Sequence, residues 1–202
     1  MEYTPPPTEK GVRQSEEILE AALRCLARDG FAATSLSRVA AEANVSKRMV
    51  LYYFESRAEL LDRLGERISE RILAQVKESL AGLTDPNMIV STGFDRIWAA
   101  ITADRGLLLA LFGMTIEGVT DDAIGDTIGD FKEGFRDLLR KQVKAARDQG
   151  RQVVVDDEVA VTLTLTGFMG LALEWLEHGD SPTLEKSIKA YKAAIVALAP
   201  MA

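Results

Sequence analysis

Apolar residues recur along this chain with the period of an α-helix. In residues 13–29, Ile18 and Ala22 fall on one face of such a helix, and Leu26 continues the same face. Gly30 follows this segment and suits the C-terminal end of a helix. The pattern therefore predicts a first helix over residues 13–29.

Two shorter segments follow, and each opens on a hydroxyl side chain. Thr34 and Ser35 offer N-caps for a helix that continues to Ala43, and Ser46 offers one for a third helix. Asn44 lies between them and tolerates the left-handed backbone conformation that a tight turn needs. Three short helices with a tight turn between the last two predict a helix-turn-helix.

Longer apolar stripes and capping residues predict helices over most of the remaining chain. Proline directly after a capping residue is typical of a helix start. The expected helices run from Ser56 to about Leu80, from Asp85-Pro86 to about Thr102, over Arg105–Gly113, over Asp126–Gln149, and onward from Ser181-Pro182. Glycines are frequent in residues 113–129, which we interpret as a simple loop or, alternatively, as a mobile gate.

The segment Val153–Thr166 allows two interpretations. Its β-branched, alternating residues are compatible with a hairpin around Asp156-Asp157. A helix capped by one of these aspartates and ending at Gly179 fits the length better, and no other segment offers a partner strand. Because such a helix is apolar nearly all round, we expect it to be buried on two sides, one of them at a subunit interface.

Composition and charge argue against several classes of protein. The net charge is −7, but the 44–54 segment holds two basic residues and no acid, so a basic surface is present locally. A single cysteine, no recognisable signal peptide and no apolar run long enough to span a bilayer indicate a cytoplasmic protein. With one histidine, His178, and no zinc or phosphate-loop spacing, we expect no catalytic residues, no metal, no cofactor and no enzyme activity.

An ordered set of residues near the N-terminus resembles the pattern of a known family. The set comprises Gly30–Leu36, Val39-Ala40, Asn44–Lys47, Val50–Phe54, Ser56-Arg57 and Leu60-Leu61. It resembles the DNA-binding domain of the tetracycline-repressor (TetR) family over about residues 13–61. The remainder is similar to the family only in length and helical pattern.

The resemblance implies an all-α fold with an N-terminal three-helix head and a larger helical bundle behind it. It implies a homodimer whose last two helices pair with those of a partner, a ligand cavity among the middle helices, and a palindromic DNA operator. We accordingly divide the chain into a disordered tail (1–11), a helix-turn-helix DNA-binding domain (12–57) and a ligand-binding and dimerisation domain (58–202).

DNA contacts are expected from two groups of side chains in the head. Hydroxyl and basic side chains, together with helix N-termini, suit phosphate oxygens. The expected phosphate contacts are Ser35, Arg38, Ser46, Tyr53 and Arg57. The expected base contacts, on the early face of the third helix, are Lys47, Arg48, Met49 and Tyr52, with Ser37 nearby. Leu51 departs from the family pattern, because it stands where a phosphate-binding tyrosine is usual.

The body is expected to bind an effector and a second subunit. Aromatic and other bulky side chains of the middle helices serve either as plain core or as the wall of a ligand site. The candidates are Phe94, Trp98, Phe112, Met114, Phe131, Phe135, Phe168 and Met169, with Thr162 as a polar anchor. The expected dimer interface comprises Gly167, Gly170, Trp175, Leu184, Ile188, Tyr191 and Ile195.

The favoured function is a ligand-responsive, DNA-binding repressor that is released from its operator by a small, largely apolar effector. The alternative is a helical ligand-binding protein that has lost operator binding, which Leu51 and the acidic body would favour.

Overall fold

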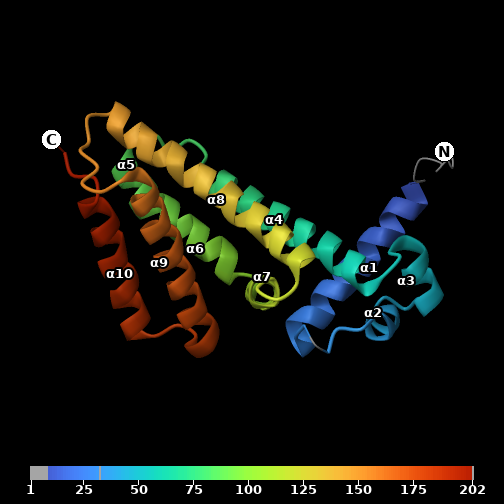
Figure 1. Cartoon of the computed structure of the whole chain (residues 1–202). Coiled ribbons are helices and arrows are strands. Elements are labelled where there is room, and N and C mark those ends of the chain that lie inside the picture. Colours follow the sequence, from blue (N-terminus) through green and yellow to red (C-terminus); the bar gives the residue numbers. More distant parts are fainter. Residues whose placement is uncertain (1–8, 32, 202) are drawn as a thin grey trace, which may run out of the picture. The chain divides into compact units, whose positions relative to one another are not determined.

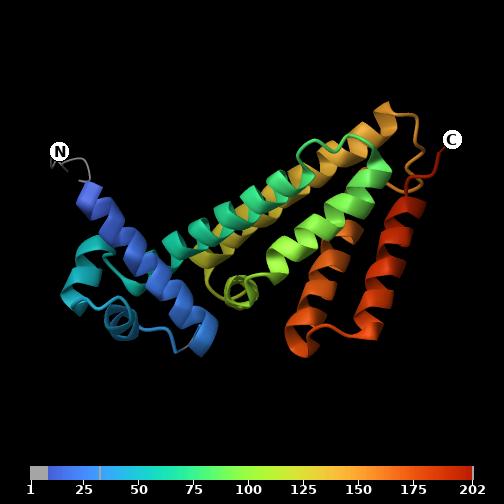
Figure 2. The ribbon, with the colours of Figure 1, turned by 180° about the vertical axis from the view of Figure 1, so that it is seen from behind.

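The computed structural model describes residues 9–31 and 33–201, and these residues are helical apart from turns and one isolated β-bridge between Arg151 and Met201. Figures 1 and 2 show the helices from opposite sides. In chain order they are α1 (Glu9–Asp29), α2 (Leu36–Glu42), α3 (Lys47–Tyr53), α4 (Arg57–Leu80), α5 (Pro86–Met88), η1 (Ile89–Gly93), α6 (Phe94–Thr102), α7 (Arg105–Glu117), α8 (Asp122–Asp148), α9 (Asp157–His178) and α10 (Pro182–Ala197). The predicted all-α class is confirmed.

The first helix begins earlier than its apolar stripe suggested. Residues 1–8 of the predicted tail lie outside the described residues, but Glu9, Lys10 and Gly11 form the first turn of α1. Glu9 suits this place, because an acidic side chain is favourable near the positive end of a helix. The predicted tail was therefore too long by three residues.

Side-chain caps set the boundaries of the helix-turn-helix. The Ser35 hydroxyl accepts a hydrogen bond from the amide of Arg38, and the Ser46 hydroxyl accepts one from the amide of Met49. Between them Asn44 adopts a left-handed conformation with φ 53°, the one described non-glycine residue with positive φ. These local interactions place α3 directly after α2, as the sequence predicted.

The glycine-rich region is helical, contrary to both sequence interpretations. Gly113 lies within α7, and Gly125 and Gly129 lie within α8, so the expected loop or gate over residues 113–129 shrinks to the turn around Gly118. A Cβ on Gly125 would lie 2.7 Å from the carbonyl oxygen of Gly118, so glycine allows two backbones to meet here. Gly118 and Gly125 thus serve close packing, whereas a Cβ on Gly113 or Gly129 would meet nothing within 4 Å.

The segment after Asp85 contains a π-helical turn that the sequence did not reveal. Asp85 caps α5, and η1 then continues into α6 with wider hydrogen-bond spacing. A Cβ on Gly93 would lie 2.8 Å from Leu80, which shows how closely this turn packs on α4. Such π-helical turns are frequent beside binding sites.

The ambiguous segment before Thr166 is helical. Asp156 accepts hydrogen bonds from the amides of Glu158 and Val159 and so caps α9, as preferred over the hairpin. Within the described residues, α9 is the single helix long and apolar enough by itself to cross a membrane, but helices in the core of globular proteins also meet this criterion.

The chain divides into two compact units. Unit 1 comprises the residues up to Ser69 together with Gly106–Ile128, and its core includes Ile18, Val39 and Leu64. Unit 2 comprises Glu70–Arg105 together with the residues from Gly129 onward, and its core includes Val76, Phe94, Val161 and Phe168. The helix-turn-helix belongs to unit 1, and α9 and α10 belong to unit 2.

Candidate nucleic-acid interface and apolar cavity

One face of α3 is buried and the other carries the predicted base-contacting side chains. Val50 is fully buried, whereas Lys47 and Arg48 are exposed and form no ion pair with any described residue. Met49 is 41% exposed and Tyr52 is 78% exposed, which is unusual for side chains of this size on a short helix. An exposed, basic and aromatic face on the second helix of a helix-turn-helix is the arrangement that reads base edges in a major groove.

Hydroxyl side chains lie on α2 and α3 and at their N-termini. The oxygens of Ser35 and Ser46 cap α2 and α3 over 3.3 Å and 3.1 Å, respectively, so their protons remain available for a phosphate oxygen. Ser37 is exposed on α2, and Tyr53 packs edge-on against Tyr52 with 5.1 Å between ring centroids. The structure thus brings these predicted contacts to the head that carries α3.

Arg38, a further predicted phosphate contact, lies in an ion-pair network that joins α1 and α2. Its Nη1 atom lies 3.2 Å from an Asp29 oxygen. Glu42 accepts hydrogen bonds from Arg24 at 2.8 Å and from Arg28 at 3.0 Å. The hydrogen bond from Arg28 lowers the pKa of Asp29, and the hydrogen bond from Arg24 lowers the pKa of Glu42. Both carboxylates therefore stay charged at neutral pH and hold the basic side chains around them.

Arg57 holds the connection between α1 and α2. Its Nε donates to the carbonyl oxygen of Thr34 at 2.8 Å, and its Nη2 donates to that of Phe31 at 2.7 Å. The guanidinium also lies 4.7 Å from the centre of the Phe31 ring. Arg57 therefore has a structural role in the head, because loop carbonyl oxygens accept two of its donors, and its phosphate contact stays a prediction.

Leu51 is 39% exposed on α3 and offers no polar atom to a phosphate. Tyr52 and Tyr53 follow it directly in the same helix. Any tyrosine contact from this helix must therefore come from those two residues.

An apolar cavity of about 150 Å³ lies within unit 2. Elements α4, α5, η1, α6, α8, α9 and α10 contribute to its wall, which is mainly aliphatic and aromatic. Representative wall residues are Val76, Leu80, Phe94, Phe135, Phe168 and Ile195. The polar residues of the wall are Asn87, Gln142, Arg151, Thr164 and Tyr191.

Both polar residues of α9 and α10 that line the cavity have hydrogen-bond partners within the protein. The Tyr191 hydroxyl donates to the carbonyl oxygen of Thr164, and the Thr164 hydroxyl donates to that of Ala160 at 2.8 Å. Burial raises the pKa of Tyr191, so its phenol remains protonated and neutral. This part of the wall is uncharged.

Comparison with known proteins assigns the chain to a family. Residues 18–64 match the family described as bacterial regulatory proteins, tetR family, and this span covers α2, α3 and the first turns of α4. The chain belongs to the TetR family. A nicotine-responsive transcriptional repressor, HdnoR of Paenarthrobacter nicotinovorans, is 26% identical over 85% of this chain and 88% of its own length.

Further relatives agree with this family over most of the chain. The probable acrEF/envCD operon repressor of Escherichia coli K12 is 25% identical over 83% of this chain and 78% of its own length. A TetR transcription regulator from Haloarcula marismortui shares the fold with a TM-score of 0.80 and 24% identity, over 94% of this chain and all of that one. This TetR-family chain is thus a DNA-binding transcriptional regulator and not an enzyme.

The cavity contains only some of the predicted ligand residues of this TetR-family regulator. Phe94, Phe135 and Phe168 line it as expected. The six others do not line it: Trp98, Phe112, Met114, Phe131, Thr162 and Met169.

The six have other surroundings. Met114 lies in unit 1 near Gly65, Trp98 stacks on Phe94, and Thr162 accepts a hydrogen bond from Arg136. The sequence missed Arg151 and Gln142, because a polar residue outside an apolar stripe gives no signal of facing a cavity.

Several predicted dimer residues are used within the subunit instead. Leu184 is buried, Ile195 lines the cavity, and Trp175 donates to Asp180 at 3.2 Å. A Cβ on Gly167 would lie 2.4 Å from the Tyr191 ring, so these two residues join α9 to α10. Within one subunit the apolar stripe of α10 thus packs on its own chain, and a dimer contact by this set stays a prediction.

Two predicted dimer residues remain to be placed. Ile188 is half-buried, whereas Gly170 is exposed with nothing near its missing side chain. Of the predicted dimer residues, Gly170 therefore has the open surroundings that contact with a second subunit requires.

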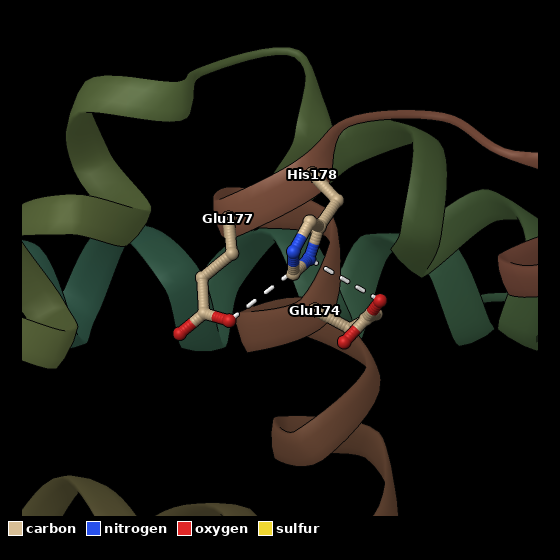
Figure 3. A group of neighbouring side chains, drawn as sticks. All are labelled: Glu174, Glu177 and His178. Atoms are coloured by element: carbon tan, nitrogen blue, oxygen red, sulfur yellow. Dashed lines mark ion pairs between the residues drawn. The ribbon is translucent and has the colours of Figure 1, made fainter.

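The single histidine of the chain lies on the surface. His178 Nδ1 lies 3.3 Å from Glu174 and 3.9 Å from Glu177, all at the end of α9 (Figure 3). The three side chains are exposed and close enough to hold a cation, but acidic groups commonly gather on surfaces without one. The cluster by itself carries no function.

Proposed function

We propose that this chain is a ligand-responsive repressor that binds a palindromic operator as a homodimer in the cytoplasm. The observation that carries the proposal is the exposed face of α3. Lys47 and Arg48 are unpaired among the described residues, and Met49 and Tyr52 stand beside them. Arginine and lysine suit guanine, and a methionine suits a thymine methyl group. Repression, rather than activation, is supported by the relatives described as repressors.

Dimerisation is supported by a bare apolar stripe on α9. Val159, Leu163 and Leu173 are 46%, 50% and 42% exposed, and Thr166 and Gly170 continue the spacing of three and four residues between them. The exposed face of α10 is rich in small residues, namely Ala190, Ala193, Ala194 and Ala197. Only 33% of the most apolar stretch of α9 is buried within one subunit. We therefore propose that a second subunit covers the rest of it.

The effector response is supported by the apolar cavity in unit 2. A largely apolar molecule would bind there, and occupancy would favour a dimer state in which the two heads no longer match successive major grooves. Half-sites on one face of DNA lie about 34–36 Å apart, so a small mismatch lowers operator affinity. Tenfold derepression requires about 1.4 kcal/mol of difference in effector affinity between the two states.

A mobility-shift experiment tests the operator proposal. DNA from upstream of the chain's own gene is titrated with protein at two salt concentrations, beside unrelated DNA. We expect a specific complex that weakens with salt and loses its sequence preference in Arg48→Ala. Lys141→Ala removes one exposed positive charge from α8 and is expected to bind like the wild type.

Two outcomes contradict this proposal. If Arg48→Ala keeps the sequence preference, α3 does not read bases through that residue. If a genome-wide selection of bound fragments finds no site preferred over unrelated DNA, operator binding has been lost, and the chain is a helical ligand-binding protein.

A further inference from the structure

Within the described part of the chain, one charged side chain in the cavity wall has no opposite charge beside it. Arg151 is only 9% exposed and follows Gly150, whose positive φ of 82° turns the chain at the end of α8. Its amide donates to Ala146 at 3.0 Å, and its Nη1 donates to the carbonyl oxygen of Ala199 at 3.0 Å. Among the described residues no carboxylate lies within ion-pair distance of this guanidinium, unlike Arg140 or Arg147 nearby.

The rest of the cavity wall does not neutralise this charge. None of the described residues that line the cavity is an aspartate or glutamate, and the hydroxyls of Thr164 and Tyr191 already donate to carbonyl oxygens. A buried cation without a counter-charge is costly, and an anion bound beside it would recover part of that cost. The cavity therefore favours a negatively charged ligand group over a neutral one, and a neutral one over a cation.

The size of the cavity limits the remainder of the ligand. At about 150 Å³ it matches apolar cavities that hold a molecule the size of benzene. Phe94, Phe135 and Phe168 supply a wall for an aromatic ring or a short alkyl chain. One guanidinium fits one carboxylate, which it can bind through two parallel hydrogen bonds.

We propose that the effector is a small carboxylic acid with an apolar body, whose carboxylate pairs with Arg151 while its ring or chain fills the cavity. This inference rests on the proposed function, because it names the effector class for that cavity. It also assigns Arg151 a binding role that its position outside any apolar stripe had concealed.

Isothermal titration calorimetry with three probes of equal length tests the charge preference. The probes are 3-phenylpropanoate, 3-phenylpropan-1-ol and 3-phenylpropylammonium, titrated into the full chain at neutral pH. We expect the carboxylate to bind at least about tenfold more tightly than the alcohol, and the ammonium to bind most weakly. Equal or weaker binding of the carboxylate, or no binding by any of the three, overturns the proposal.

Variants assign the preference to Arg151. Arg151→Met is expected to lose the carboxylate preference but to keep alcohol binding, which also shows that the cavity is folded. Arg151→Lys keeps the positive charge but cannot bind a carboxylate through two parallel hydrogen bonds, so it should retain part of the carboxylate preference. Lys141→Met removes a positive charge from the exposed face of α8 and should bind all three probes like the wild type. A carboxylate preference that survives in folded Arg151→Met overturns the assignment.

Failure of this inference can be told apart from failure of the proposed function. If operator DNA is bound but the carboxylate is not, the effector class alone is wrong. If the carboxylate binds through Arg151 yet leaves the operator complex intact, the anion site stands and the proposed release mechanism fails. The wild-type probe series decides the charge preference even if Arg151→Met does not fold.

Discussion

At the scale of single residues, the basic side chains of the head have two distinct roles. Lys47 and Arg48 project from α3 without partners among the described residues, whereas Arg28 and Arg57 bind groups of their own domain. Formal charge does not separate these roles, since all four side chains are positive at neutral pH. The separation comes from which acceptors lie within reach of each side chain.

Arg57→Met is expected to destabilise the head rather than to remove a DNA contact. The variant loses two hydrogen bonds from a charged donor to the carbonyls of Thr34 and Phe31. We expect the free energy of unfolding to fall by about 2 kcal/mol in urea denaturation. Arg48→Met, the matched exposed variant, should stay within about 0.5 kcal/mol of the wild type. If Arg57→Met is as stable as the wild type and the slope of log affinity for DNA against log salt concentration falls by about one, Arg57 instead contacts a phosphate.

Glu42→Gln is expected to lower the melting temperature in a pH-dependent way. Hydrogen bonds from Arg24 and Arg28 hold the pKa of Glu42 below its ordinary value of 4.5. A lowered pKa stabilises the fold above the ordinary value, and this stabilisation is lost as the pH falls through the folded pKa. The difference in melting temperature between wild type and variant should therefore be full at pH 7 and shrink below about pH 4.

The control for this prediction is Glu70→Gln, because Glu70 is exposed on α4 and takes no part in the network. Its melting temperature should follow that of the wild type at every pH. A Glu42→Gln deficit that stays constant down to pH 3 would show that packing, and not charge, is responsible.

At the scale of elements, two glycines of α9 separate packing within a subunit from packing between subunits. Gly167 lies against Tyr191, whereas Gly170 has nothing within 4 Å of its missing side chain. Gly167→Ala should force α10 away and cost about 1–3 kcal/mol of stability. Gly170→Ala should leave the fold intact and gain up to about 1 kcal/mol from helix propensity. Urea denaturation of both variants measures this, and equal effects would contradict the assignment of the two faces.

How far the sequence predicts these elements depends on whether the signal is local. The caps at Ser46 and Asp156 and the left-handed Asn44 are properties of a few neighbouring residues, so the starts of α3 and α9 were predicted correctly. The contact between Gly118 and Gly125 is a tertiary one, and the same glycines were taken for a loop.

The same reasoning explains which site residues were found. The exposed face of α3 follows from helical periodicity, because Val50 marks the buried side. Arg151 lies outside any helix, and its burial depends on contacts with a segment almost fifty residues further along the chain. No local pattern reports such a contact, so the polar part of the cavity could not be predicted.

At the scale of the whole molecule, the proposed function requires that two heads act as one. Two half-sites bound by linked heads give far higher affinity than either alone, because the second contact becomes intramolecular. The apolar stripe of α9 is the surface proposed to provide this link, with Leu163 half exposed at its centre. Operator affinity should therefore depend on residues that never touch DNA.

Leu163→Glu is expected to separate the subunits and thereby weaken operator binding. A carboxylate at the centre of the apolar stripe would be buried without a partner in the dimer, whereas in the monomer it stays in water. Analytical ultracentrifugation should show a monomer at micromolar concentration, where we expect the wild type to be a dimer. Affinity for a full palindrome should fall at least about a hundredfold, while affinity for a single half-site stays unchanged.

Ile116→Glu is the matched control, because Ile116 is 72% exposed on α7 and belongs to unit 1, whereas the stripe belongs to unit 2. It introduces the same charge and should remain dimeric with normal operator affinity. If Leu163→Glu stays a dimer, the subunits associate through another surface. If it is monomeric yet binds the palindrome like the wild type, a single head suffices for recognition, and the effector cannot act by changing the spacing between two heads.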